Sequence, residues 1–147
     1  TTYLYGTTTV DTANDYYAVV AYNVYNFGII VENSDGEDII LIDYIGLEND
    51  LILPESITEI YQYAFKGRTG LTSVVIPGKV ESIGNNAFEG CSGLTSVTFN
   101  DTSAWYMTKE KTNWENKTDG TNMDVTVSTD NVAHFKDNNY CNYWYKL

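Results

Sequence analysis

The sequence repeats itself at an interval of 23 residues. Residues 51–70 read LILPESITEIYQYAFKGRTG, and residues 74–93 read VVIPGKVESIGNNAFEGCSG. At this offset the two stretches share aliphatic positions, a proline, an Ala-Phe pair and two glycines: Leu51/Val74, Leu53/Ile76, Pro54/Pro77, Ile57/Val80, Ile60/Ile83, Ala64/Ala87, Phe65/Phe88, Gly67/Gly90 and Gly70/Gly93. A further copy begins at residues 94–99, where LTSVTF repeats the LTSVVI of residues 71–76. Self-similarity at a fixed period of about 20 to 50 residues indicates a solenoid, in which each repeat forms one coil and stacks on the next.

One repeat has the hydrophobic pattern of a short strand followed by a short helix. Val74 and Ile76 are two residues apart, as on the buried face of a strand, and Pro77 ends the hydrogen bonding that a strand needs. The next apolar positions are spaced as on one face of a short helix that returns over the strand: Val80, Ile83, Ala87 and Phe88. Gly90 and Gly93 permit the turns that bring the chain back. The pattern therefore predicts an α/β coil.

The stretch LTSVVIPGKVESIGNNAFEGCSGLTSV is similar to the treponemal-type, BspA-like leucine-rich repeats of bacterial surface antigens. The unit of that family runs LxxIxIPxxVxxIxxxAFxxC. Residues 71–99 match it at almost every position, and residues 51–70 match it well. The resemblance implies a curved leucine-rich-repeat solenoid on an exported or surface-anchored protein, used for adhesion or for contact with other proteins. It places the chain outside the cell or at the cell surface, with any signal peptide removed or lying outside this sequence.

One position departs from the family pattern. Cys91 stands where the family places a small buried cysteine, and the equivalent position one coil earlier is Arg68. A buried guanidinium without a partner would be costly. We therefore expect Arg68 to lie at an edge, or to reach a carboxylate of the acidic N-terminal part: Asp43, Glu48 or Asp50.

The flanks of the repeat are expected to close its open ends, because two coils and a strand are fewer than the roughly three repeats that a solenoid needs. Val-, Ile- and Tyr-rich stretches at 16–21, 27–32 and 38–45, with the turn signal Asn-Ser-Asp-Gly at 33–36, predict a strand hairpin or a small antiparallel sheet. The chain beyond residue 100 is polar with spaced aromatic residues, and it resembles the C-terminal segment of the same antigens. We predict one cooperative domain with three parts: a β-rich N-terminal cap at 1–46, the repeats at 47–100 and an aromatic C-terminal cap at 101–147.

The charge of the chain is strongly negative and unevenly distributed. Asp and Glu number 20 against 8 Lys and Arg, and residues 1–65 hold 11 acidic and no basic side chains. Nucleic acids and anionic membrane surfaces select for Lys and Arg, so the composition argues against both as partners. The acidic part is either a means of solubility or a patch for a basic partner or for calcium. Oxygen-rich side chains at one turn lack the spacing of a calcium-binding loop, which favours a solvated turn: Asn33, Asp35, Glu37 and Asp38.

Few residues offer catalytic or metal chemistry. His134 is the single histidine, and no nucleophile-elbow, zinc-protease or phosphate-binding motif occurs. Packing inside a coil explains Cys91, and this is favoured over a disulfide with Cys141. A short solenoid offers no obvious deep cleft for a pair of catalytic carboxylates. No apolar stretch approaches the roughly 20 residues of a membrane-spanning helix. We therefore expect a protein that is not an enzyme and that holds no metal or cofactor.

Two surfaces are candidates for binding. The first is the outward face of the repeat strands, where side chains of successive coils are expected side by side: Asp50, Ile52, Ser73, Val75, Ser96 and Thr98. The second is an aromatic platform on which sugar rings stack, and it requires exposed rings: Trp105, Trp114, Trp144 and Tyr145. The alternative for those rings is that they fill the open end of the solenoid.

Three functions are compatible with these surfaces. The first, which we favour, is a binding or adhesion module for a protein of a host or of the extracellular matrix. The second is a carbohydrate-binding module that uses the Tyr- and Trp-rich C-terminal segment. The third is an architectural module without a ligand of its own. Exposed rings favour the second function, and buried rings oppose it.

Overall fold

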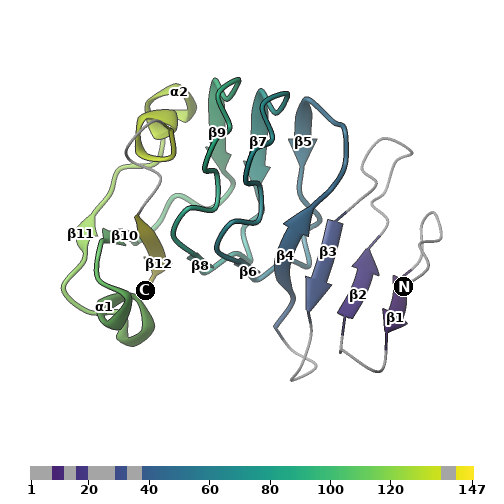
Figure 1. Cartoon of the computed structure of the whole chain (residues 1–147). Coiled ribbons are helices and arrows are strands. Elements are labelled where there is room, and N and C mark those ends of the chain that lie inside the picture. Colours follow the sequence, from purple (N-terminus) through teal and green to yellow (C-terminus); the bar gives the residue numbers. More distant parts are fainter. Residues whose placement is uncertain (1–7, 12–15, 20–28, 33–37, 137–141) are drawn as a thin grey trace.

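Two parallel strand ladders run through the middle of the chain (Figure 1). The computed structural model describes residues 8–11, 16–19, 29–32, 38–136 and 142–147. The first ladder is a three-stranded sheet: β5 (Asp50–Ile52), β7 (Ser73–Ile76) and β9 (Ser96–Phe99). The second ladder lies within a larger sheet: β4 (Ile40–Tyr44), β6 (Glu59–Ile60) and β8 (Ser82–Ile83). The two ladders and the helices of the C-terminal part make a mixed, strand-rich α/β fold.

The repeat period is visible in the pairing of the strands. In the first ladder Ser73 lies between Asp50 and Ser96, and each pair is 23 residues apart. The pairing of β6 with β8 has the same offset. Backbone hydrogen bonds between coils follow it too, since the Thr72 N–H donates to the Asn49 carbonyl oxygen at 2.7 Å. Each coil therefore places a repeat position beside its equivalent in the next coil.

A column of aromatic rings runs through the core from coil to coil. Phe65 and Phe88, the rings of the two Ala-Phe pairs, stack almost parallel at an angle of 4°, with centroids 4.8 Å apart. Tyr44 extends the column at one end, 5.6 Å from Phe65. At the other end Phe135 lies 5.1 Å from Phe88, and Trp144 stacks on Phe135 at 4.7 Å. All five rings are buried, so the column joins the repeats to both flanking segments.

The return segments of the two coils are strands and turns, so the predicted short helices are wrong. Ile83 lies in β8, and the residues from 85 to 90 form turns. Tyr63 and Asn86, which occupy equivalent positions in the two coils, have left-handed backbone with φ of 61° and 58°. A right-handed helix cannot continue through such a residue. The apolar spacing imitated a helix because some inward positions belong to a two-residue strand and the others to a tight turn.

The N-terminal part extends the second ladder. Its described strands are β1 (Thr8–Asp11), β2 (Tyr16–Val19) and β3 (Ile29–Glu32). They pair antiparallel in chain order up to β4, and β4 then pairs parallel with β6. The sequence predicts the antiparallel pairing of β2, β3 and β4 but not the strand β1. Leu41 and Tyr44 of β4 are buried in the core of the repeats. The predicted turn at 33–36 lies outside the described residues.

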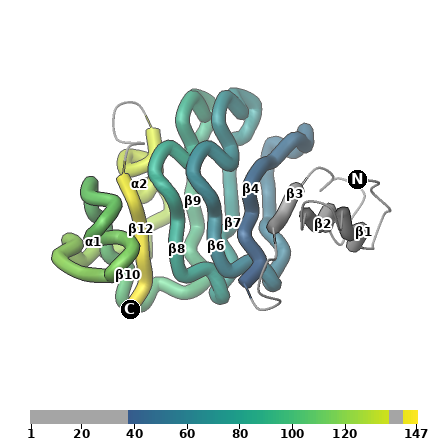
Figure 2. The backbone as a smooth tube through the Cα atoms, turned by 60° about the horizontal axis from the view of Figure 1, so that its bottom comes forward, coloured from purple at the N-terminus to yellow at the C-terminus, as the bar shows by residue number. Residues whose placement is uncertain are grey.

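The C-terminal part packs on the last strands of both ladders. Its elements are β10 (Trp105–Thr108), α1 (Lys111–Asn116), β11 (Thr121–Asn122), α2 (Ser128–Asn131), a 3-10 helix (Val132–His134) and β12 (Tyr143–Lys146). Strand β12 pairs antiparallel with β8 and β10 and lies beside β8 in Figure 2. On the other ladder, Asn131 Nδ2 donates to the carbonyl oxygens of Val97 at 2.8 Å and Val125 at 2.9 Å, which holds α2 against β9. The division into two caps and a repeat region stays a prediction.

None of the helices in the described part of the chain is long and apolar enough to cross a membrane.

Gly93 marks a close approach between two coils. A Cβ atom at this position would collide with the Thr69 carbonyl oxygen of the preceding coil. Gly78 offers a comparison, because its Cβ would meet nothing nearer than the Asp101 Cβ at 3.8 Å, which is an ordinary contact. Gly93 therefore cannot carry a side chain without moving the two coils apart, whereas a methyl group fits at Gly78.

We expect Gly93→Ala to lower the free energy of unfolding by about 1–3 kcal/mol, because the two coils must move apart to admit the methyl group. Gly78→Ala should leave this free energy unchanged or raise it by about 0.5 kcal/mol, since alanine restricts the unfolded chain. Urea unfolding followed by circular dichroism measures both variants. Equal unfolding midpoints for the two variants would contradict the close approach.

Candidate functional site

The six residues predicted on the outward face of the repeat strands do lie side by side on the first ladder. Two rows run across the strands: Asp50, Ser73 and Ser96 form one, and Ile52, Val75 and Thr98 form the other. The residues between the rows point inward, since Leu51, Val74 and Val97 are buried. Ile52 is the most open apolar member, with 61% of its surface exposed. The face thus carries a polar row beside a neutral to apolar row.

Asp50 is held in place at one end of the polar row. Its Oδ1 accepts hydrogen bonds from the Ser73 hydroxyl at 2.7 Å and from the Thr72 hydroxyl at 2.9 Å. These two hydrogen bonds hold the pKa of Asp50 below its usual range, because both stabilise the charged form of the carboxyl. The bond from Ser73 has the larger effect and the bond from Thr72 the smaller one. The face therefore presents one ordered negative charge to solvent.

The predicted aromatic platform is wrong for three of its four residues. Trp105, Trp144 and Tyr145 expose at most 1% of their surface. Trp105 packs edge-on against Phe99 with centroids 5.0 Å apart, and Trp144 belongs to the aromatic column. These rings fill the space beyond the last coil, because the apolar surface of that coil has to be covered. A buried ring cannot offer its face to a sugar.

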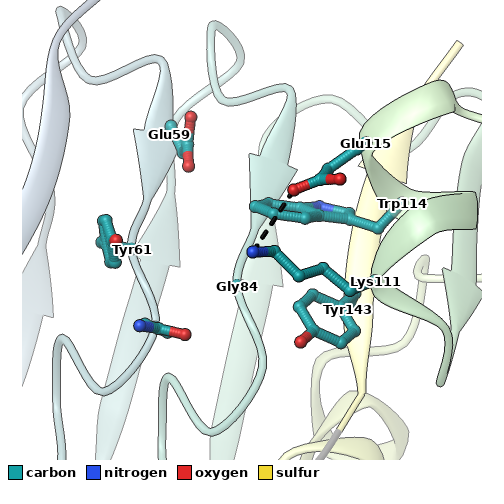
Figure 3. A pocket seen from close by; sticks show the side chains of 8 residues that line it. Glu59, Tyr61, Gly84, Lys111, Trp114, Glu115 and Tyr143 are labelled. Carbon is teal, nitrogen blue, oxygen red and sulfur yellow. Dashed lines mark ion pairs between the residues drawn. The ribbon is translucent and has the colours of Figure 1, made fainter.

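Trp114 is the exception, and it lines two adjoining hollows on the outer side of the second ladder, which we name the Trp114 groove. The first hollow has a volume of about 220 Å³ and lies between β6 and α1. Figure 3 shows Glu59 and Tyr61 on one side and the side chains of α1 on the other, with Gly84 between them. The second hollow, also about 220 Å³, shares Glu59, Trp114 and Glu115 with the first.

The sequence did not reveal the β6 side of the Trp114 groove. Glu59 and Tyr61 flank the buried Ile60, which is the alternation of a strand. Over three residues this signal is too short to distinguish a strand from the helix that the wider spacing suggested. The sequence pattern therefore gives no signal of a surface at the outward positions of the return segments.

Arg68 lies half-buried at the rim of a further hollow, of about 200 Å³, which Tyr44 and Glu48 also line. Within the described residues its guanidinium forms no ion pair with Asp43, Glu48 or Asp50, so the expected carboxylate partner is wrong. The Arg68 Nε is buried without a hydrogen-bond partner. The position at a rim agrees with the other expectation, that Arg68 lies at an edge.

His134 and Cys91, the residues considered for catalysis, both make packing contacts within the fold. His134 is half-buried and packs edge-to-face with the Trp144 ring, with centroids 5.8 Å apart. Cys91 is a buried free thiol that donates to the Phe65 carbonyl oxygen at 3.0 Å. Burial raises the pKa of the Cys91 thiol to about 11. In the part of the chain that the structure describes, no cluster of three potential metal ligands occurs. Cys141 and most of the acidic turn considered for calcium lie outside that part.

We expect the Asp50 carboxyl to titrate below the usual range of aspartates, and Ser73→Ala to raise its pKa because the strongest hydrogen bond to the charged form is lost. Since the folded-state pKa is depressed, the stabilising effect of this charge is present above the unfolded pKa and disappears as the pH falls through the folded pKa. NMR titration of the carboxyl carbon measures the shift. An unchanged Asp50 pKa in Ser73→Ala would contradict this assignment.

We expect Cys91 to resist alkylation in the folded protein, because the thiolate is the reactive form and a thiol with a pKa of about 11 stays protonated at neutral pH. Iodoacetamide labelling of a Cys141→Ser variant, followed by mass spectrometry, isolates Cys91. Labelling should be slow at pH 7, faster as the pH approaches 11, and rapid in urea. Rapid labelling of the folded protein at pH 7 would show that Cys91 is accessible and ionised.

A family model and a solved structure are similar to parts of this chain. No curated protein matches this chain. A crystal structure of a leucine rich cell surface protein from Faecalibacterium prausnitzii A2-165 is similar, with 26% identity and a TM-score of 0.47. The match covers 57% of this chain and 24% of that protein, so this chain spans about a quarter of its length. Residues 45–138, more than half of the chain, match the family model described as BspA type leucine rich repeat region (6 copies). The chain therefore belongs to the family of BspA-type leucine-rich repeat proteins.

Proposed function

We propose that this chain is a non-enzymatic adhesion module that acts at the cell surface or outside the cell and binds a protein through the first ladder. Membership of the family supports this, because its leucine-rich repeats are typically protein-binding modules rather than enzymes. The observation that carries the proposal is the pair of aligned rows on β5, β7 and β9. Rigid strands hold these side chains in register, so little conformational entropy is lost when a partner binds.

The contact surface extends beyond the three strands. A specific interface buries about 800 Å² on each partner, which is more than three short strands offer. Ile45 and Leu47, in the segment that leads into β5, are exposed large apolar residues like Ile52. We infer that this segment contributes to the interface, with Asp50 as a charged group near its centre. The partner should then present an apolar surface with a basic side chain opposite Asp50.

The acidic composition supports an extracellular protein partner. The chain carries a net charge of −12, so basic proteins are attracted and nucleic acids and anionic membranes are repelled. Proteins of a host or of the extracellular matrix are the class that fits the family resemblance. An architectural module without a ligand remains the alternative, and binding assays distinguish the two.

We expect wild-type protein to bind at least one member of a panel of immobilised collagen, laminin and fibronectin. Ile52→Asp should weaken this binding about tenfold, because a carboxylate in the centre of the interface must lose its water without gaining a partner. Leu147→Asp is the matched control, since Leu147 has a similar exposure of 66% against 61% for Ile52 and lies at the end of the chain. Biolayer interferometry measures all three proteins.

Two results of this experiment would contradict the proposal. Equal losses in Ile52→Asp and Leu147→Asp would show that the contact does not involve the first ladder. Absence of binding to every protein of the panel and to a host-cell surface preparation would favour the architectural alternative.

A further inference from the structure

The aromatic wall of the Trp114 groove is the Trp114 indole, which is held in a fixed position by its neighbours. The Trp114 Nε1–H donates to the Trp144 carbonyl oxygen at 2.9 Å, which ties the indole to β12. The Tyr143 ring packs against it with centroids 5.1 Å apart and an angle of 35°. Trp114 remains only half-buried despite these contacts. The indole is therefore held in place before any ligand arrives, and this reduces the entropy lost on binding.

The floor and opposite wall of the groove come from the repeats themselves. Gly84 is buried and lines the first hollow, where its backbone lies close against the chain at Tyr61 and Gln62. Glycine is required there, because a Cβ atom at Gly84 would approach the Gln62 backbone nitrogen to 2.6 Å. In the second hollow Glu59 and Tyr145 flank Ser82 in the pairing of β6, β8 and β12. The same register that aligns the first ladder thus shapes this groove.

Formal charges balance in the groove, although the chain as a whole is strongly acidic. Two carboxylates, Glu59 and Glu115, and two ammonium groups, Lys111 and Lys117, line the two hollows. The Lys111 Nζ lies 3.4 Å from the Glu115 Oε1, and the Lys117 Nζ lies 3.7 Å from the Oε2 of Glu81, which lines neither hollow. A cation or an anion would therefore meet two attracting and two repelling side chains, and neither gains a net attraction from the lining. A neutral ligand is compatible with this balance.

The remaining chemistry of the groove matches a sugar. A pyranose ring has an apolar C–H face that stacks on indole or phenol rings, and a rim of hydroxyl groups. Carboxylates accept hydrogen bonds from hydroxyls, lysines donate to them, and the Gln62 amide does both. A volume of about 220 Å³ is smaller than the roughly 300–1,000 Å³ of pockets for drug-sized molecules. Each hollow thus has room for one small ring rather than for a larger ligand.

We propose that the Trp114 groove binds a neutral oligosaccharide, with adjacent sugar units in the two hollows that Trp114 lines. The Trp114 indole stacks on one unit, and Tyr61 contacts it from the β6 side. The groove lies on the second ladder, so this binding is separate from the protein contact proposed for the first ladder. The glycan-binding element is a groove shared by the repeats and α1, in place of the platform of C-terminal rings.

Titration with soluble glycans tests the proposal in the intact chain. The probes are cellotriose, maltotriose, mannotriose and triacetylchitotriose, and the readout is the indole N–H resonance of Trp114 in ¹⁵N-labelled protein, assigned with Trp114→Phe. The Trp105 and Trp144 resonances are internal references, because both rings are buried. We expect at least one probe to shift the Trp114 resonance saturably and to leave the two references in place.

Two tyrosines provide a matched pair of variants. Tyr61 and Tyr63 are two residues apart and similarly exposed, at 40% and 43%, but only Tyr61 lines the groove. Tyr61→Ala should weaken binding of the active probe about tenfold, as expected for the loss of an aromatic contact. Tyr63→Ala should leave the affinity unchanged. Circular dichroism and the two reference resonances verify that both variants are folded.

The possible results separate this inference from its rivals and from the proposed function. Absence of a Trp114 shift with all four glycans would overturn it. A shift with tetramethylammonium chloride but with none of the glycans would also overturn it, in favour of a cation site. Equal losses in the two tyrosine variants would show that the sugar binds elsewhere. Ile52→Asp should bind the active glycan normally, so a failure at one ladder does not count against the other.

Discussion

The stacking of Phe65 on Phe88 is the contact on which the rest of this structure depends. Their centroid separation of 4.8 Å equals the spacing of about 4.7–4.9 Å between hydrogen-bonded strands. Rings and strands can therefore advance together from coil to coil only when both coils have the same length. The 23-residue period satisfies both requirements at once, and glycine at position 93 removes the methyl group that would separate the coils.

Both candidate binding surfaces result from this register. On the first ladder, equal coil lengths bring Ile52, Val75 and Thr98 into one row, so a contact surface forms from residues far apart in the sequence. On the second ladder, the outward positions of the return strands face α1, and the hollow that Trp114 lines lies between them, with the close-packed backbone of Gly84 among its lining residues. One repeat thus supplies two outer faces of different character. The first is a flat row of side chains, and the second is a hollow with an aromatic wall.

The sequence predicted those parts of the fold that depend on repetition. The recurrence of Phe65 and Phe88 at equivalent positions predicted that both rings are buried. The alternation of strand residues predicted the two outward rows of the first ladder. The return segments were misread because a two-residue strand carries too little periodicity to oppose a helical spacing. Left-handed backbone at Tyr63 was also hidden, since tyrosine rarely adopts it, and only the asparagine at the equivalent position 86 is a residue type that favours it.

Tertiary contacts that do not recur from coil to coil could not be predicted from the sequence, because they too lack a periodic pattern. Phe135 continues the aromatic column beyond Phe88, but the 23-residue offset from Phe88 leads to Lys111 and not to Phe135. The same holds for the Trp114 groove, whose walls come from segments about fifty residues apart. Burial of Trp105 and Trp144 could be argued from the open end of the last coil, but exposure of Trp114 could not. Unique tertiary packing leaves no periodic signal to detect.

Contacts of each coil with its immediate neighbours have a consequence for how such a chain can evolve. A gene segment that encodes one 23-residue unit can be duplicated in frame between β7 and β9, and the new coil meets strands of the same register as those already present. The row on the first ladder then becomes wider by one strand, whereas α1 and β12 keep their own neighbours at the far end. Partner contact area can thus be enlarged by copying, without redesign of the groove that the terminal segment completes.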